Sequence, residues 1–214
     1  MSYDEVYGKS DHVFGEKHET LLQKFLPMLS RERPVLDIGV GQGRNALYLA
    51  RHGFEVHGID PSKVAVDTVA ALASKGSLPI EVRQCDFETY VPLADCYSAV
   101  LIFGLIQILP WQGIHRLVSR IGEWTASGGL VFVTGFLFSD ASYLRYVQEG
   151  ERLGKHSFVM PPGDVRTFLE PEEILRLFSD FIPLHHWEGM GPYHRHGKGP
   201  RERHARVEAV FQIA

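Results

Sequence analysis

Cysteine is scarce in this sequence, since Cys85 and Cys96 are the two found among 214 residues. Two cysteines cannot build the set of disulfides that stabilises small secreted domains. The first residues also lack the basic stretch and apolar run of a secretory signal peptide. Both absences favour a reducing, cytoplasmic location.

Long apolar runs and an excess of positive charge are also missing. The most apolar stretch, residues 99–109, is interrupted by Gly104 and Gln107, whereas a transmembrane helix needs roughly 18 or more consecutive apolar residues. We therefore expect this stretch to lie in a protein core, with no membrane involved. The formal net charge of -4 argues against a general nucleic-acid-binding protein, which usually carries a strong basic excess.

What the sequence does contain is typical of a globular protein. It is 44% hydrophobic and 22% charged, and its length suffices to bury a substantial core. The sequence has no internal repeat, no low-complexity segment and no long linker. Residues 1–214 are therefore expected to form a single domain.

Segments with strand and helix periodicity alternate over residues 34–136. Strands are expected at 34–38, 54–59, 80–85, 99–103 and 130–136, and helices at 44–51, 62–74 and 111–125, after a first helix that carries Leu21, Leu22, Phe25 and Leu29. Such alternation predicts right-handed crossovers and a doubly wound, Rossmann-like α/β sheet.

The last part of the chain follows a different pattern. A helix is expected at 170–178, followed by strands at 183–188 and 204–213. The loop between these two strands is too short to contain a crossover helix, so the strands must pair antiparallel. The sheet is therefore expected to be mostly parallel, with an antiparallel last strand.

A glycine-rich turn follows the first expected strand, with the sequence Asp37-Ile-Gly39-Val-Gly41-Gln-Gly43-Arg-Asn-Ala46. Glycines allow a tight turn and a close approach to a ligand, and the N-terminus of the next helix offers free N–H donors. The spacing of Gly41, Gly43 and Ala46 also fits the loose dinucleotide fingerprint. The turn alone therefore leaves open which nucleoside it binds.

Three acidic residues restrict the choice of ligand. Asp37 lies inside the turn, where it would repel a pyrophosphate but suit a ligand with an ammonium and a sulfonium group. Asp60 ends the second strand, 23 residues later, placed to accept from ribose hydroxyls, and Asp86 ends the third, placed to accept from an adenine amino group. Strand ends of this kind share one crevice. Each Asp alone could merely cap a helix or turn, but all three beside the glycine turn favour a binding site.

These residues carry a resemblance to a known family. Residues 35–50, 58–60 and 85–87 resemble the cofactor-binding motifs of class I S-adenosylmethionine-dependent methyltransferases. More narrowly, the run Gly41-Gln-Gly43-Arg-Asn-Ala-Leu-Tyr-Leu-Ala50 resembles the tellurite-resistance methyltransferase family of the TehB type. The resemblance spans nearly the whole chain and is specific in this glycine block. It implies S-adenosyl-L-methionine as cofactor and S-adenosyl-L-homocysteine as product.

The resemblance also implies which residues bind the cofactor. Gly39, Gly41, Arg44 and Asn45 would surround the methionine moiety, Asp60 and Pro61 the ribose, and Asp86 and Phe87 the adenine, with Asp37 and Gly43 in the same glycine turn. Phe103, after the fourth strand, would flank the reacting end of the cofactor, although core packing explains this residue equally well. Family members often carry a cysteine where this chain has Val40, so no thiol can act there.

The loop between the last two strands, residues 189–203, is expected to hang over the cofactor. Residues 185–206 hold five Lys or Arg against two acids, a net charge of +3, which leaves -7 for the rest of the chain. A cationic loop above a crevice attracts anions. Three interpretations are open: a solvated basic loop, a metal site, and a site that recognises the methyl acceptor.

The residue types in this loop help to choose among these interpretations. A metal site could draw on His185, His186, His194, His196 and His204, but no cysteine is near and the spacing fits no zinc signature, so no metal is expected. The resemblance favours the acceptor site, because His and Arg line that site in the matching loop of the family. His194 and Arg195 match most directly, and Arg203 or Arg206 supplies a further cation. We therefore take His194, Arg195 and Arg203 as the candidate catalytic residues.

Methyl transfer would proceed by in-line attack of the acceptor on the sulfonium methyl, with the protein supplying positioning and exclusion of water. A thiolate or a chalcogen oxyanion needs no strong base, and an acceptor that must lose a proton would use a histidine. The resemblance suggests a small, anionic acceptor such as tellurite, selenite or a small thiol. The fourth strand ends without the Pro-Pro aromatic motif of enzymes that methylate nucleic-acid bases, so no nucleic acid is expected.

Other functions stay open at this stage. The acceptor could be an organic carboxylate, hydroxyl or amine, and the chain could be a nicotinamide-dependent oxidoreductase, which Asp37 disfavours, or a non-catalytic cofactor-binding module. The expected layout is an N-terminal lid and helix (1–30), a cofactor-binding half (34–136) and an acceptor-side half (137–214). The lid, with Tyr3, Tyr7 and Phe14, could instead be a frayed terminus. The oligomeric state is not predictable from the sequence.

Overall fold

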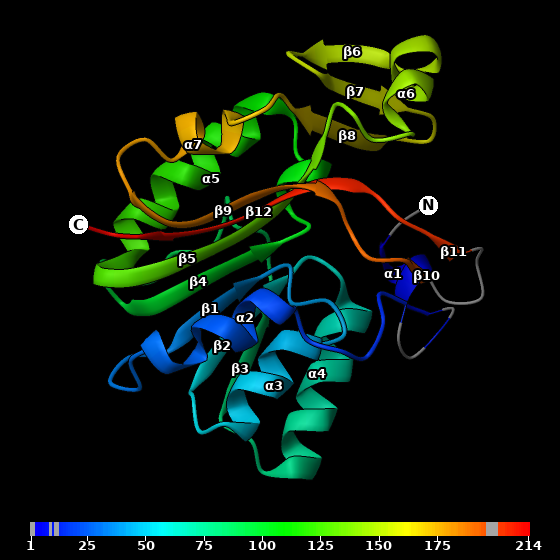
Figure 1. Cartoon of the computed structure of the whole chain (residues 1–214). Coiled ribbons are helices and arrows are strands. Elements are labelled where there is room, and N and C mark those ends of the chain that lie inside the picture. Colours follow the sequence, from blue (N-terminus) through cyan, green and yellow to red (C-terminus); the bar gives the residue numbers. More distant parts are fainter. Residues whose placement is uncertain (1–2, 9, 11–12, 196–200) are drawn as a thin grey trace.

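A β-sheet runs through the centre of the molecule, with helices on both of its faces (Figure 1). The computed structural model describes residues 3–8, 10, 13–195 and 201–214. The first five strands lie in the order β3-β2-β1-β4-β5 and are parallel. They are β1 (Val35–Ile38), β2 (Val56–Asp60), β3 (Ile80–Gln84), β4 (Tyr97–Phe103) and β5 (Thr125–Leu137).

The last two long strands pair as the sequence predicts. β12 (Ala205–Gln212) runs antiparallel to β5, and β9 (Ile182–Met190) pairs antiparallel with the other side of β12. β9 therefore runs in the direction of the parallel strands, and β12 is the reversed one. The prediction of a Rossmann-like, mostly parallel sheet with an antiparallel last strand is confirmed.

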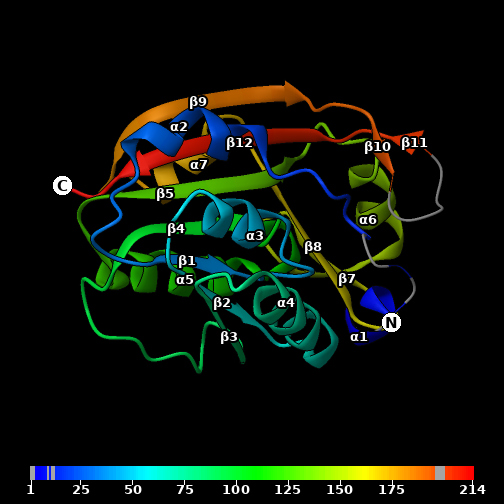
Figure 2. The same cartoon turned by 90° about the horizontal axis from the view of Figure 1, so that it is seen from below.

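Helices cover the two faces of the sheet in two groups. α2 (Thr20–Phe25), α3 (Arg44–Arg51) and α4 (Lys63–Gly76) lie on one face, and α5 (Trp111–Trp124) and α7 (Glu173–Leu177) lie on the other (Figures 1 and 2). The buried side chains of β5 alternate accordingly, since Val131 and Val133 pack on the α5 side while Leu130 and Phe132 pack on the α3 side. Burial of β5 on both faces explains its continuous apolar run.

Residues 138–169 form a small unit that the sequence pattern did not reveal. It comprises α6 (Tyr143–Glu149) and the antiparallel strands β6 (Glu151–Gly154), β7 (Ser157–Met160) and β8 (Asp164–Leu169). The end of β8 joins the main sheet by parallel pairing with the last residues of β5, Phe136 and Leu137. The strand β6 is largely exposed, so it lacks the apolar alternation from which strands are predicted.

Some element boundaries differ from those expected. The helix expected to reach residue 125 ends at Trp124, and β5 starts directly at Thr125 instead of after the glycines at 128 and 129. The first helix ends at Phe25 and continues as the 3-10 turn Leu26–Met28, because Pro27 lacks the N–H that would extend an α-helix. The helix expected at 170–178 is the shorter α7.

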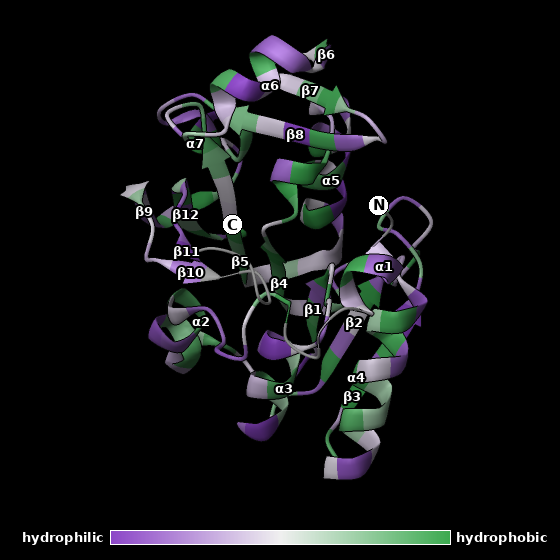
Figure 3. Cartoon of the chain, turned by 90° about the vertical axis from the view of Figure 1, so that its right-hand side faces the viewer, coloured by the Kyte–Doolittle hydropathy of each residue, from purple (hydrophilic) through white to green (hydrophobic). Residues whose placement is uncertain are grey.

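The parallel strands end at one edge of the sheet, which faces the viewer in Figure 3. Three short elements lie at this edge: α1 (Tyr3–Tyr7), β10 (His194–Arg195) and β11 (Arg201–Glu202). A short 3-10 helix, Ile106–Ile108, follows β4 there as well. Among the described residues, no helix combines the length and apolar character that a membrane crossing requires.

Candidate cofactor and acceptor site

The glycine turn after β1 has a backbone that requires glycine. Gly39, Gly41 and Gly43 have φ angles of +76°, +52° and +84°, a region that residues with a side chain rarely adopt. A methyl group on Gly43 would come within 2.9 Å of Cγ2 of Val69 on α4, and one on Gly41 within 3.1 Å of the hydroxyl of Tyr7. Both the conformation and the available space therefore exclude larger residues.

Asp60 connects this turn to the start of α4. Its carboxylate is 3% exposed and accepts hydrogen bonds from the backbone N–H of Gly41 and of Ser62, each at 2.9 Å. Burial raises the pKa of this carboxyl group, and the two N–H donors act against that rise. Each carboxylate oxygen has a second lone pair, so the predicted contact with ribose hydroxyls is compatible with both bonds.

Asp37 is a buried carboxylate at the base of the turn. The residue is 3% exposed, and burial raises its pKa to about 7, with Arg44 opposing and Asp60 reinforcing the shift. Within the described part of the chain no N–H or O–H group donates to this carboxylate to offset its burial. A positively charged ligand group next to Asp37 would stabilise its ionised form.

The polar side chains of the glycine block hold the N-terminal segment. The side-chain oxygen of Asn45 accepts from the backbone N–H of Glu19 at 2.9 Å, and Arg44 forms an ion pair with the Glu19 carboxylate at 2.5 Å. Gln42 accepts from the N–H of Val13 at 2.8 Å. Arg44 and Asn45, predicted to surround a methionine moiety, thus also position residues 13–19, a role that the sequence did not indicate.

The helix α1 covers the glycine turn and packs on α4. Tyr7 is 8% exposed, and burial raises the pKa of its hydroxyl, with Asp60 and Asp37 acting in the same direction. The pKa of Tyr3 is also raised by burial, and its charged neighbours include Arg166 on β8. This segment therefore lies over the glycine turn, between α4 and the small unit at 138–169, and its function as a lid stays a prediction.

The residues predicted at the ribose, at the adenine and at the reacting end of the cofactor differ in how deeply they are buried. Asp86 is exposed, and its carboxylate accepts from the N–H of Thr89 at 2.9 Å, which is the turn-capping alternative. Phe87 is only 5% exposed and packs in the core on the α5 side of the sheet. Pro61 is exposed beside Asp60. Phe103 is half-buried at the end of β4, with its ring centroid 6.1 Å from that of Phe132.

The loop between β9 and β12 folds into the two-stranded β10–β11 hairpin. In its register His194 is opposite Glu202, and Arg195 is opposite Arg201. Arg203 is exposed, with its guanidinium 4.9 Å from the ring centre of Tyr193. His194 thus shares a face with Glu202, and the structure does not bring its ring together with the Arg203 side chain. The side chain of Arg195 and all of His196 and Lys198 lie outside the described residues.

His204 has a buried partner that the sequence did not reveal. Its Nδ1 lies 3.0 Å from Oδ2 of Asp140, which is 4% exposed and also accepts from the backbone N–H of Ala205 at 2.9 Å. The His204 ring stacks on Phe136 at 4.4 Å, at the end of β5. Burial alone would raise the pKa of Asp140, but hydrogen bonds from His204 and Ser142 lower it below its ordinary value.

Arg206 links the acceptor side to the N-terminal segment. Its guanidinium lies 3.8 Å from Glu19, the partner of Arg44, and is also paired with Glu208. Its Nε is buried and has no hydrogen-bond partner in the part of the chain that the structure describes. A buried donor of this kind is costly unless a ligand satisfies it. The sequence left open whether Arg203 or Arg206 supplies the further cation. Arg203 is exposed, whereas Arg206 has a buried Nε.

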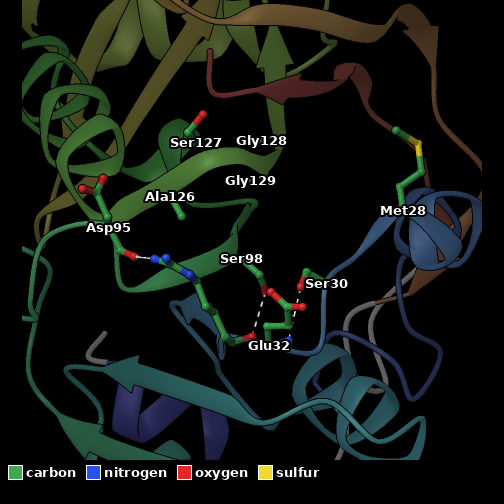
Figure 4. A pocket seen from close by; sticks show the side chains of 10 residues that line it. Met28, Ser30, Glu32, Asp95, Ser98, Ala126, Ser127, Gly128 and Gly129 are labelled. Carbon is green, nitrogen blue, oxygen red and sulfur yellow. Dashed lines mark hydrogen bonds between the residues drawn. The ribbon is translucent and has the colours of Figure 1, made fainter.

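A cavity of 440 Å³ lies at the opposite edge of the sheet, where β1, β4 and β5 begin (Figure 4). Its wall includes Met28, Asp95, Ser98 and the backbone of residues 127–129. The hydroxyl of Ser98 donates to the carbonyl of Arg33 at 2.9 Å, inside this wall. Because the glycine turn and the three acids are at the other edge, this cavity is not the predicted cofactor site.

Part of the chain matches a known domain family, and the chain is similar to several known proteins. Residues 35–129 match the methyltransferase domain. The chain is 41% identical over 151 residues to hemagglutinin 1 of Eikenella corrodens, across 71% of this chain and 47% of the relative. It is 25% identical over 201 residues to a probable (S)-tetrahydroprotoberberine N-methyltransferase 2 of Papaver bracteatum, across 86% and 55%. The chain thus spans about half the length of these curated relatives.

The overall fold is similar to that of a solved structure, TehB from Haemophilus influenzae. The sequences are 18% identical, and the match covers 99% of this chain and 67% of that one with a TM-score of 0.72. The chain therefore carries a class I, S-adenosylmethionine-dependent methyltransferase domain, in which residues 35–129 hold the glycine turn, Asp37, Asp60 and Asp86. Over its full length, its fold resembles that of the TehB type.

Proposed function

We propose that this protein transfers the methyl group of S-adenosylmethionine to a small, anionic acceptor, with a chalcogen oxyanion such as tellurite or selenite, or a small thiol, as the preferred class. The observation that carries the cofactor part is the pair of buried carboxylates, Asp37 and Asp60, at a turn where Gly39, Gly41 and Gly43 have positive φ angles. The acceptor part is supported by the cationic loop before β12 and by the resemblance to TehB.

The residues of the turn fit this cofactor. Its methionine end carries an ammonium and its reacting centre a sulfonium, so the ligand brings positive charge and no phosphate to Asp37. A cation there offsets the burial of the Asp37 carboxylate, which a pyrophosphate would worsen. We assign Gly39, Gly41, Gly43, Arg44 and Asn45 to the methionine end, Asp60 and Pro61 to the ribose, and Asp86 and Phe87 to the adenine, with Phe103 beside the reacting end.

The acceptor would bind between the cofactor and the β10–β11 hairpin. We assign its recognition to His194, Arg195 and Arg203, with Arg206 as a fourth group because its Nε has no hydrogen-bond partner among the described residues. The bound cofactor supplies an electrophilic methyl group. The chain itself positions the acceptor in line and excludes water through the segment over the turn. An acceptor that arrives protonated would lose its proton to His194.

An organic carboxylate, hydroxyl or amine is the second acceptor class, since the Papaver relative is named as an N-methyltransferase. A cytoplasmic location would suit the proposal, because Cys85 and Cys96 are both free thiols.

A ligand titration followed by a product screen tests this function. S-adenosylhomocysteine at about 100 times its dissociation constant should raise the melting temperature by roughly 5 to 10 °C, while NADH should leave it unchanged. A shift with NADH alone would overturn the cofactor assignment. The screen then measures methyl transfer to tellurite, selenite, small thiols, carboxylates and amines, and turnover confined to amines would overturn the acceptor class.

A further inference from the structure

Three side chains with metal-binding atoms converge beside the β10–β11 hairpin. One ligand atom each of His194, Glu202 and His204 lies within 4.8 Å of the other two. All three residues are half-buried. Atoms bound to one zinc-type ion lie about 2.0 to 2.2 Å from it. Two atoms that bind the same ion therefore lie at most about 4.4 Å apart, so the three side chains must close in slightly to share one ion.

The hairpin register explains why these three residues meet. His194 and Glu202 are directly opposite each other in the antiparallel pair, so their side chains lie on the same face. His204 is two residues beyond Glu202 and returns to that face. The rings of His194 and His204 have their centroids 5.3 Å apart. Tyr193 precedes His194, and Arg203 lies between Glu202 and His204. The side chains of Tyr193 and Arg203 contact each other.

Each histidine is oriented by a hydrogen bond at its other ring nitrogen. Nδ1 of His204 donates to the buried carboxylate of Asp140 at 3.0 Å. Nδ1 of His194 lies 3.3 Å from the carbonyl oxygen of Pro192, which can only accept. Both bonds favour the tautomer with the proton on Nδ1, which makes Nε2 the metal-binding nitrogen. A carboxylate behind a histidine is the usual outer support of a metal ligand.

We propose that His194, Glu202 and His204 bind a divalent transition-metal ion of the zinc class, with Asp140 as the positioning residue for His204. Two imidazoles and one carboxylate favour such an ion over Mg²⁺ or Ca²⁺, which prefer oxygen ligands throughout. Three protein ligands leave a coordination position for a small molecule. This site goes beyond the proposed methyl transfer, because the ion binds without cofactor or acceptor. It shares His194 with the proposed acceptor site, so a bound ion would occupy the ring nitrogen that otherwise takes a proton from the acceptor.

Titration calorimetry with Zn²⁺ on the full chain, free of any affinity tag and stripped with a chelator, tests the proposal. We expect one Zn²⁺ per chain, with at least about 100-fold weaker binding in both His204→Gln and Glu202→Gln. Asp140→Asn should weaken binding about 10- to 100-fold. The control His52→Gln, at an exposed histidine bonded to the carbonyl of Tyr48, should bind as the wild type does.

Circular dichroism checks that each variant is folded. The Zn²⁺ affinity of a variant is compared with that of the wild type only when their spectra match. Unchanged Zn²⁺ affinity in folded His204→Gln and Glu202→Gln, or no stoichiometric Zn²⁺ binding by the wild type, would overturn the proposal. The same preparations are titrated with S-adenosylhomocysteine. If they bind it normally without Zn²⁺, the metal site has failed while the cofactor assignment stands.

Discussion

The backbone N–H of Gly41 donates to Oδ2 of Asp60 at 2.9 Å, across 19 residues of sequence. This bond holds the glycine turn after β1 against the end of β2, while the other carboxylate oxygen accepts from Ser62 at the start of α4. One side chain therefore fixes the three pieces of backbone that border the proposed ribose position. The shape of the site and its contact with the cofactor depend on the same carboxylate.

Asp60→Asn should weaken the binding of S-adenosylhomocysteine by at least about 10-fold. The amide keeps the size of the side chain but replaces one acceptor oxygen by a donor that faces an N–H group, which leaves a buried polar group unsatisfied. Calorimetry measures the affinity. Asp67→Asn, an exposed acid on α4, is the control and should bind normally. Equal affinities in the two folded variants would contradict the role of Asp60.

Asp37 should make the stability of the protein depend on pH. Its pKa is raised from 3.8 to about 7 by burial, so the unfolded chain ionises first as pH increases. The free energy of unfolding therefore falls between about pH 4 and pH 7 and gains nothing from this group above that range. The amide of the Asp37→Asn variant does not titrate, so the variant lacks this fall. Between about pH 4 and pH 7 the free energy of unfolding of the variant should therefore increase relative to that of the wild type, by up to about 4 kcal/mol.

Urea denaturation of both proteins at a series of pH values measures this difference. S-adenosylhomocysteine provides a second measurement, since its ammonium favours ionised Asp37 and its affinity for the wild type should increase as pH rises toward 7. Parallel stability curves for the two proteins would show that Asp37 does not titrate in this range.

Gly43→Ala should destabilise the protein by about 1 to 3 kcal/mol and abolish cofactor binding. Its φ angle is +84°, and the new methyl group would meet Val69 at 2.9 Å. Gly128→Ala is the matched control, because φ there is +76° but no atom lies within 4 Å of the added methyl group. The control thus carries the backbone strain without the collision. If Gly43→Ala is no less stable than Gly128→Ala, the close packing of the turn on α4 is disproved.

Tyr7→Ala should shorten the residence time of S-adenosylhomocysteine by about 10-fold or more. Tyr7 covers the glycine turn from α1, and removing its ring opens a path for release of the ligand. Stopped-flow displacement measures the dissociation rate. Tyr7→Phe retains the ring and should release the ligand at nearly the wild-type rate. A wild-type rate in Tyr7→Ala would mean that the N-terminal segment is not a lid.

His194→Ala, Arg195→Ala and Arg203→Ala should each lower methyl-transfer turnover by about 10-fold or more while the affinity for S-adenosylhomocysteine stays within about 2-fold, because their contacts are assigned to the acceptor. Arg201→Ala is the matched control, since Arg201 contacts the same Tyr193 ring as Arg203. Full activity in all three variants would return the loop to a solvated basic segment.

Much of the fold was predictable because its pattern is local. Gly39, Gly41 and Gly43 have left-handed backbones that the turn demands, and the apolar runs of β4 and β5 reflect burial on both faces of the sheet. The antiparallel pairing of β9 and β12 followed from the length of the loop alone. These features depend on neighbours in the sequence or on chain geometry.

Contacts between distant segments were not predictable in the same way. Asp140 looks like an ordinary turn residue in the sequence, and its bond to His204 spans 64 residues. Glu19 gains its importance only when Arg44 and Arg206 are brought to it. Phe87 belongs to the core cluster on the α5 side of the sheet, a burial that its motif did not indicate, and its contact with the adenine stays a prediction. Such relationships are set by tertiary packing, for which a single sequence carries no pattern.

A crystal structure with S-adenosylhomocysteine tests the central claim most directly. The account predicts the ligand along the turn from Gly39 to Gly43, with its ammonium group near Asp37 and its ribose hydroxyls bonded to Asp60. A ligand bound elsewhere, with this turn uncontacted and Asp60 directed away from the sugar, would contradict it.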